Sequence, residues 1–422
     1  MQSKYTLDER PGIGPLLLYG LQWWVVSLPC VIIMGVIVAR LHFDDIALQT
    51  VYVQKLFGLV GVVTIAQVLI GHRLPLIVGP AAILLVGLIA STASSIASVY
   101  TAVLVGGAGL TMLALSGLLS RLRFFFTSRI VAAILILIAF TITPTILRLM
   151  TGTGARPAFD LSFGILLVLA LVVCNKVLPG IWKSLTVILG IAGGSFLYFL
   201  LTAFPVIPEL RTAETFLLPL GGLEFHLGTV LSFVFCFLAL LINELGSIES
   251  VGFMLDAGDM AGRIKKGTAL QGVANIAAGG LEVIGTVDYS LSAGIIAATG
   301  CASRYPLVPA GLGLVFCAFV PDLVLLLSCI PGVVMGALML YLMSSQLASG
   351  LSMLVSEKGV TDFSSGLTVG LPLMLGLLIA FAPGSTFNGF PDLLRPILGN
   401  GFVMGTIAVV ILEHVVFRNE SR

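Results

Sequence analysis

The 422-residue sequence contains few charged residues and few histidines, and its six cysteines are scattered singly along the chain. Charged residues make up 10% of the chain and hydrophobic residues 58%, whereas an ordinary soluble domain is about 25% charged. A water-soluble fold of this size would lack the polar side chains needed to cover its surface. This shortage argues against a soluble enzyme, a nucleic-acid-binding protein and a disordered scaffold, and it leaves a polytopic membrane protein.

Other absences narrow the function further. The net charge is +1, so no long-range field favours a polyanion and no nucleic-acid partner is expected. The six cysteines stand singly, with no Cys-x-x-Cys pair and no cluster with histidine, so we expect neither a disulfide scaffold nor a metal or cofactor site. No nucleophile–base pattern is present, which argues against an enzyme.

The apolar residues form continuous runs, and not the alternating ten-residue segments of a membrane barrel. Several runs are about twenty residues long, as a spanning helix requires. Only helices and closed barrels satisfy their backbone groups in lipid, so the sequence predicts an all-α bundle of roughly 12–14 spans. The runs, or their most apolar cores, are Leu16–Val38, Ile130–Leu147, Leu161–Val173, Leu185–Leu201, Val230–Ile242, Leu323–Leu342 and Leu367–Phe381.

Basic residues fall in alternate connections between these runs. The basic connections contain His72–Arg73, Arg121, Arg123, Arg129, Lys176, Lys183, Arg263, Lys265 and Lys266. The intervening ones contain Asp44–Asp45, Glu209 to Glu214 and Asp392. Because short cytoplasmic loops carry the excess of Lys and Arg, the pattern predicts an even number of spans with both termini in the cytoplasm, and we expect the inner (plasma) membrane.

Two segments are interrupted by glycine or proline. Leu74–Ala82 precedes helix-forming residues up to Ala90, and Val283–Gly294 precedes Ile295–Thr299. Each is typical of a short strand that leads into a half-helix N-terminus, which favours a partial negative charge on a ligand. The first lies roughly 75 residues into the chain and the second a similar distance beyond Val206, as an inverted repeat of seven plus seven spans would place them. The alternative is that these residues only mark loops.

Carboxylates within the membrane are the strongest candidates for function, because burying one costs roughly 2.5–3.5 kcal/mol. The candidates are Glu244, Glu249, Glu282 and Asp288. Glu244 and Glu249 are five residues apart, so on a helix they point about 140° apart and are not expected to face one site. We assign Glu249 to the cavity, because the small residues near it let another segment approach, and expect Glu244 to pair elsewhere.

Asp288 has two possible roles. It lies three residues before Leu291, where the second half-helix is expected to begin, so it is either a cap of that helix or a second polar contact for the ligand.

These residues resemble the nucleobase–ascorbate transporter family, which includes the bacterial uracil, xanthine and urate permeases. The resemblance runs from about Glu9 to Ile411, nearly the whole chain, in the family's order. It is carried by Glu9–Arg10–Pro11, Gly20–Leu21–Gln22, Arg73–Leu74–Pro75 to Gly79, Glu249–Ser250–Val251–Gly252, Lys266–Gly267 to Gly279, Thr299–Gly300–Cys301–Ala302–Ser303–Arg304–Tyr305, Pro331 to Gly336, Ala348–Ser349–Gly350 and Ile397–Leu398 to Gly405.

The resemblance implies fourteen spans in two inverted repeats of seven, with a core domain, a gate domain and short strands in the third and tenth spans. It also implies a homodimer. The expected divisions are a cytoplasmic N-terminus (1–14), a first repeat (15–205, spans 1–7), a second repeat (206–417, spans 8–14) and a cytoplasmic tail (418–422). The implied function is secondary active transport of a nucleobase by proton symport and an elevator-like movement. Glu249 takes the position of the family's substrate anchor.

Several family positions are replaced in this chain. Trp23 follows Gln22 where the family has His, and Phe253 stands where it has His or Asp. Leu291 and Ser292 replace the polar residue and the Asn of the tenth-span motif, and Ala82 replaces a stacking aromatic. Polar contacts to the substrate are thus fewer than the family pattern implies.

The expected site therefore has one acidic anchor and an apolar wall. The expected substrate-binding residues are Glu249, Ala82, Tyr289, Ser290, Leu291, Ser292, Phe253 and Gln22, and the expected proton-coupling residues are Glu249, Asp288 and Glu244. The alternative function is transport of an anion or small carboxylate, because related folds hold anions at paired half-helix ends. The absence of Arg or Lys near the predicted site argues against it.

Overall fold

The computed structural model describes residues 5–91, 94–119, 127–151, 156–178, 186–202, 222–289, 292, 295–296, 301–356, 358–387, 389–391 and 394–417. These residues form helices and one two-stranded sheet. The helices are α1 (Ile13–His42), α2 (Ile46–Leu69), α3 (Ala82–Ala90), α4 (Ile96–Leu115), α6 (Ser128–Thr151), α7 (Pro157–Val177), α9 (Thr186–Leu201), α10 (Leu227–Met254), α11 (Met260–Leu281), α13 (Leu307–Ala318), α14 (Pro321–Ser328), α15 (Gly332–Ser356), α16 (Phe363–Phe381), α17 (Arg395–Leu398) and α18 (Gly401–Ile411). The strands are β1 (Ile77–Pro80) and β2 (Thr286–Tyr289).

The described helices confirm an all-α polytopic membrane protein. Eight of them are long and apolar enough to cross a membrane: α1, α2, α4, α6, α7, α10, α15 and α16. Three shorter apolar helices, α9, α13 and the one that α18 begins, add to these. With the more polar α11 and the two broken segments that contain β1 and β2, the described elements account for the fourteen expected crossings.

The outside of the bundle is apolar. Leu166 on α7, Leu200 on α9 and Leu378 on α16 are 65%, 63% and 70% exposed. Large apolar side chains are exposed on many of the helices in this way, and lipid covers them at no cost.

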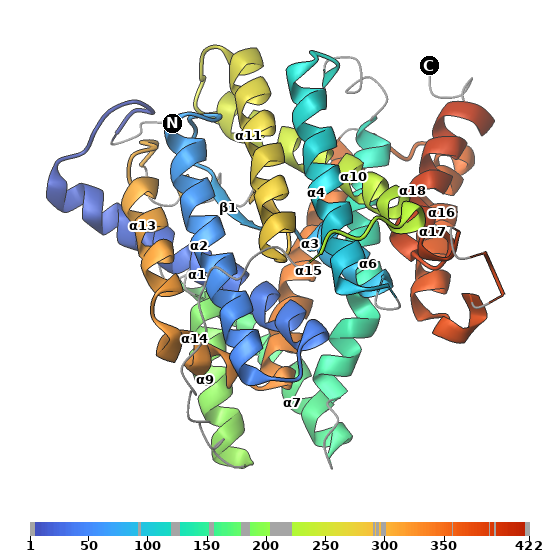
Figure 1. Cartoon of the computed structure of the whole chain (residues 1–422), viewed down its shortest axis with the longest axis horizontal. Helices are drawn as coiled ribbons and strands as arrows, with labels where there is room; N and C mark the ends of the chain where they lie inside the picture. The colour runs from blue at the N-terminus through green and yellow to red at the C-terminus, as the bar shows by residue number, and fades with distance from the viewer. Residues whose placement is uncertain are drawn as a thin grey trace.

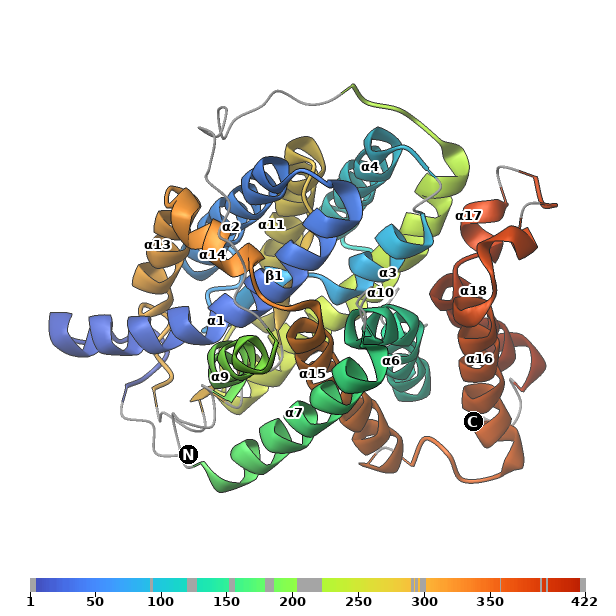
Figure 2. The same cartoon turned by 90° about the horizontal axis from the view of Figure 1, so that it is seen from below.

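Helices from the two halves of the chain pack in pairs (Figures 1 and 2). In both views α2 lies along α13 and α4 along α11, and α6 also packs on α15. The backbones touch in the first two pairs: a Cβ on Gly61 would lie 2.6 Å from the Gly311 carbonyl oxygen, and one on Gly107 would lie 2.8 Å from the Gly272 carbonyl oxygen. The same glycine-to-glycine crossing thus occurs twice with the halves exchanged, as an inverted repeat requires.

Both segments expected to be broken contain a strand. β1 and β2 pair antiparallel, with Val78 opposite Asp288. The Ala81 N–H extends the pairing by donating to the Gly285 carbonyl at 2.8 Å, and α3 begins at the next residue. A strand followed by a half-helix is therefore confirmed for the first segment. For the second the strand is confirmed, and most of the expected helix lies outside the described residues.

Two expectations about element boundaries are wrong. The run Leu323–Leu342 was expected to be one span, but α14 ends at Ser328 and α15 begins at Gly332. Pro331 precedes α15, and because proline lacks an N–H it favours a helix start over a helix interior. The basic residues 263–266, expected in a connection, lie within the first two turns of α11, whose N-cap Asp259 accepts from the Gly262 N–H at 3.1 Å.

The residue at position 107 tests the helix crossing. Gly107→Val is expected to lower the free energy of unfolding by about 1–3 kcal/mol, because a side chain there meets the α11 backbone. The matched control is Gly109→Val on the same helix, where an added Cβ meets nothing within 4 Å. Thermal unfolding of the detergent-purified proteins would measure the difference, and equal midpoints for the two variants would contradict the crossing.

Candidate functional site

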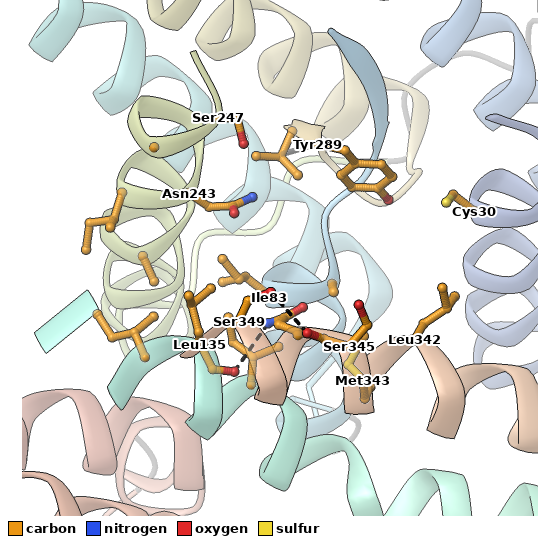
Figure 3. Close-up of a pocket in the computed structure, with 18 of the residues that line it drawn as sticks. Cys30, Ile83, Leu135, Asn243, Ser247, Tyr289, Leu342, Met343, Ser345 and Ser349 are labelled. Carbon is orange, nitrogen blue, oxygen red and sulfur yellow. Dashed lines mark hydrogen bonds between the residues drawn. The ribbon is translucent and has the colours of Figure 1, made fainter. Parts of the chain in front are cut away.

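A cavity of about 480 Å³ lies beside the ends of the paired strands. Residues of α1, α3, β2 and α10 line it together with residues of α6 and α15. Figure 3 shows Asn243 and Ser247 reaching into it from α10, Tyr289 from β2, and Ser345 and Ser349 from α15. The rest of the lining is mainly aliphatic side chains and methionine, so the cavity is apolar with a few polar groups.

The first half-helix points its N-terminus at this cavity. Ala82 and Ile83, the first two residues of α3, both line it, and no side chain caps the helix start. The first N–H groups of a helix have no intrahelical acceptor and carry the positive end of its dipole. This end of α3 therefore favours a carbonyl or another electron-rich atom of a ligand.

The second strand presents one face to the cavity. Val287 and Tyr289 line the cavity, while Asp288 between them points the other way, as alternation along a strand requires. The Tyr289 hydroxyl donates to the Pro80 carbonyl at 2.5 Å, and the ring lies against Gly79, where an added Cβ would come within 2.5 Å of it. An aromatic ring is thus held in place at the edge of the cavity.

Asn243 is one of the polar cavity side chains that the sequence interpretation missed. Its amide has no hydrogen-bond partner among the described residues, whereas the Ser247 hydroxyl donates to the Asp288 carbonyl at 3.0 Å. An amide offers one acceptor and two donor hydrogens side by side, which can read a donor–acceptor edge. Its position in an apolar run directly before Glu244 was the available signal.

Glu249 does not line the cavity, and it lies at the edge of the α10 face that does. Seven residues make nearly two helical turns, so Glu249 points in nearly the same direction from α10 as the cavity residue Ile242. Glu249 also lies about one turn beyond the cavity residue Gly246. The Glu249 side chain is half-buried. Phe253 is one turn further on and 73% exposed, so the structure places it away from the cavity.

The other expected residues lie around the cavity or outside the described residues. Gln22 is half-buried on α1, two turns before the cavity residue Cys30. Ser292 accepts from the Ile77 N–H at 2.9 Å and donates to the Tyr289 carbonyl at 2.8 Å, so it links the two broken segments. Ser290 and Leu291 lie outside the described residues.

The two remaining acids lie together on the far side of β2. Glu244 and Asp288 are completely buried, and Glu244 Oε2 accepts from the Asp288 backbone N–H at 3.0 Å. The structure thus brings Glu244 to Asp288 and leaves Glu249 at the edge of the cavity face of α10.

Comparison with known proteins identifies transporters. A family model described as a permease family (Xan_ur_permease) matches residues 14–385. A nucleobase transporter, PlUacP, of Paenibacillus larvae is 25% identical over 330 residues, covering 75% of this chain and 74% of that protein. The uric acid permease PucJ of Bacillus subtilis is 25% identical over 381 residues, covering 84% of this chain and 82% of its own.

Among solved structures, the transmembrane domain of the cyanobacterial bicarbonate transporter BicA has a similar fold. Its TM-score is 0.66 at 14% identity, and the match covers 93% of this chain and all of that domain. At this identity the likeness concerns the fold alone, which has the same inverted repeat.

Gly246 allows the cavity to be filled without disturbing its walls. A Cβ at this position meets nothing within 4 Å, so Gly246→Leu is expected to project into the cavity and leave the melting temperature unchanged or higher. The variant should lose the thermal stabilisation that ligands produce in a screen of purines, pyrimidines and small carboxylates. Gly109→Leu, which also enters open space, should keep it. Ligand stabilisation retained in Gly246→Leu would show that the ligand binds elsewhere.

Proposed function

This chain belongs to the xanthine/uracil permease family of nucleobase–ascorbate transporters, and we propose that it carries a nucleobase or a related small heterocycle across the membrane by proton symport. It is a transporter and not an enzyme. Relatives named for uric acid and nucleobases support a substrate of the xanthine, urate or uracil type.

The proposal rests on one cavity that is lined both by the two broken segments and by continuous helices. One side is built from α3 and β2, which belong to the two broken segments, together with the continuous helix α10, and the other from α6 and α15. Its volume of about 480 Å³ suits a small ring compound. Sliding the first group of elements past the second would expose the cavity to each side in turn, which is the elevator-like movement we propose.

Tyr289 supplies the aromatic surface in this proposal. The family's stacking aromatic is replaced by Ala82, yet Ala82 and Tyr289 line the same cavity from the two broken segments. A planar base can therefore lie against the Tyr289 ring, with the small Ala82 leaving room for it. The second broken segment would thus provide the aromatic ring that the family pattern places on the first.

Polar recognition in this proposal comes from α10 and from the α3 N-terminus. Asn243 reads one edge of the base, and a ring carbonyl meets the first N–H groups of α3. Glu249, six residues further along α10, grips a second N–H edge. Glu249 is also the natural site for a proton that travels with the substrate.

An anion carrier remains the alternative, because BicA shares the fold. The described residues that line the cavity include no arginine, lysine or histidine, and the acid nearest to them along α10 on its cavity edge is Glu249. An anion would therefore meet only the α3 dipole, which favours a neutral heterocycle as substrate.

The remaining organisation is proposed on the family pattern. The two inverted repeats are residues 15–205 and 206–417, and their boundary lies outside the described residues. The protein is proposed to form a homodimer in the inner membrane with both termini in the cytoplasm, because basic residues gather near alternate span ends in the sequence.

The direct test is uptake into proteoliposomes. Labelled xanthine, urate, uracil and sulfate are supplied under an imposed inward proton gradient, and each is repeated with the gradient collapsed. Accumulation of at least one base, dependent on the gradient, is expected. Accumulation of sulfate alone would favour the anion carrier.

The Glu249 anchor is tested by Glu249→Gln. The variant is expected to fold and insert but to lose substrate binding by roughly tenfold or more, since a hydrogen bond to a charged group contributes about 1.5–3 kcal/mol. Asp256→Asn is the matched control, because it removes a carboxylate just beyond α10 at a positive φ that asparagine tolerates. Calorimetry on both proteins decides, and wild-type affinity in Glu249→Gln would remove Glu249 from the site.

The stacking role is tested at Tyr289. Tyr289→Ala should weaken binding by roughly twofold to tenfold, because an aromatic pair contributes about 0.5–1.5 kcal/mol. Tyr289→Phe keeps the ring and removes only the hydrogen bond to Pro80, so it should bind nearer to wild type. If the two variants lose affinity equally, the hydroxyl and not the ring is the important group.

A further inference from the structure

A cluster of three ionisable side chains lies directly behind the strand that faces the cavity. Asp288 of β2, Glu244 of α10 and His72 of the α2–β1 connection are all completely buried. Tyr289, the next residue along β2, lines the cavity on the opposite face of the strand. The cluster is therefore separated from the cavity by the thickness of one strand.

The contacts fix the orientation of each group. His72 Nδ1 accepts from the Leu74 N–H at 2.9 Å, so a neutral His72 carries its proton on Nε2, which lies 3.2 Å from Asp288 Oδ2. Glu244 accepts from the Asp288 N–H, and its carboxyl group interacts electrostatically with that of Asp288.

The groups around the cluster do not neutralise two negative charges. From α11, Arg263 donates to the carbonyls of His72 and Arg73, at 3.0 and 2.8 Å, and not to a carboxylate. From α2 the neutral Gln67 side chain faces the His72 backbone, and β1 contributes no ionisable residue. Farther along α10, Glu249 adds only another acid.

A bound proton resolves this arrangement. Glu244 Oε1 and Asp288 Oδ1 meet no hydrogen-bond donor in the described part of the chain. Two neighbouring carboxylates that are both buried cannot both stay ionised at low cost, and protonating one supplies the donor that the other lacks. The cluster thus has the composition of a site that holds one exchangeable proton.

We propose that the cluster of His72, Asp288 and Glu244 is a buried proton-binding site that couples proton movement to substrate movement from behind β2. The proposal rests on the proposed symport and adds to it a proton site distinct from Glu249. A proton taken up from one aqueous side forms an O–H bond on one of the two carboxyl groups, and that bond breaks when the proton leaves to the other side.

The cluster reaches the cavity through two short connections. One is the backbone between Asp288 and its neighbour Tyr289, whose hydroxyl donates to the Pro80 carbonyl at the end of β1. The other is Ser247, which lines the cavity and donates to the Asp288 carbonyl. Loss of the proton makes the two carboxylates repel, which displaces β2 and with it the Tyr289 ring and the Ser247 hydroxyl. By the same coupling, substrate binding shifts the equilibrium between the two positions of β2 and so changes how tightly the cluster holds its proton.

The experiment separates coupling from substrate binding. Glu244→Gln and Asp288→Asn are reconstituted, and two rates are measured for a base that the wild type carries: accumulation driven by a proton gradient, and exchange of labelled for unlabelled base without a gradient. In each variant the ratio of inside to outside base concentration is expected to fall to about one. Exchange should stay within about threefold of wild type, because it needs no net proton transfer.

Asp160→Asn is the matched control. Asp160 is a buried carboxylate outside the cluster that accepts from the Tyr198 hydroxyl at 2.9 Å, and an amide oxygen preserves that bond. Both rates should match wild type in this variant. Wild-type accumulation in Glu244→Gln and Asp288→Asn would overturn the proposal, as would parallel loss of both rates in well-folded protein.

An infrared measurement covers the case in which these variants fail to fold. In Glu249→Gln, a pH-induced difference spectrum should still show a protonated carboxyl band above about pH 6, where exposed carboxyl groups are ionised. Absence of the band would overturn the proposal. If the wild type carries no base in either assay, the proposed function fails, whereas absence of the infrared band overturns the proton site independently of transport.

Discussion

The pairing of β1 with β2 is the interaction on which the rest of the structure depends. A chain that leaves the helical path inside a membrane exposes N–H and C=O groups that lipid cannot satisfy. Here the two broken segments satisfy one another, with Val78 opposite Asp288 and the Ala81 N–H on the Gly285 carbonyl. This pairing sets where α3 begins and therefore where its free N–H groups point. It also brings residues from the two halves of the chain to one cavity.

β2 has two faces with different chemistry. Val287 and Tyr289 face the apolar cavity, whereas Asp288 faces His72 and Glu244. In the resemblance to the permease family, this chain lacks the polar residue at Leu291 and the stacking aromatic at Ala82. In the structure, Asn243 on α10 supplies a polar group and Tyr289 on β2 an aromatic ring at the cavity. The separation lets an apolar binding surface and a buried acid lie on the same short strand, because successive side chains of a strand point in opposite directions.

Much of the fold could be predicted from local patterns. Charge scarcity and twenty-residue apolar runs predicted a helical membrane protein. Glycine marked both broken segments, and proline also marked the first. Each of these signals depends only on neighbouring residues. The angle between Glu244 and Glu249 followed from helical geometry in the same way. The interruption at Pro331 was missed because apolar side chains continue on both sides of it. Asn243 was missed because a single polar residue in an apolar helix does not show which face it occupies.

The sequence by itself determined that this chain lies in a membrane, that it is helical and where two of its spans break. These properties follow from hydropathy, length and backbone preference along one segment at a time. Only the tertiary structure decided that His72 meets Asp288, that Glu244 accepts from the Asp288 backbone, and that Tyr289 rather than Phe253 lies at the cavity. Helical and strand periods predict which residues share a face, but the partner of each face depends on how distant segments pair and pack.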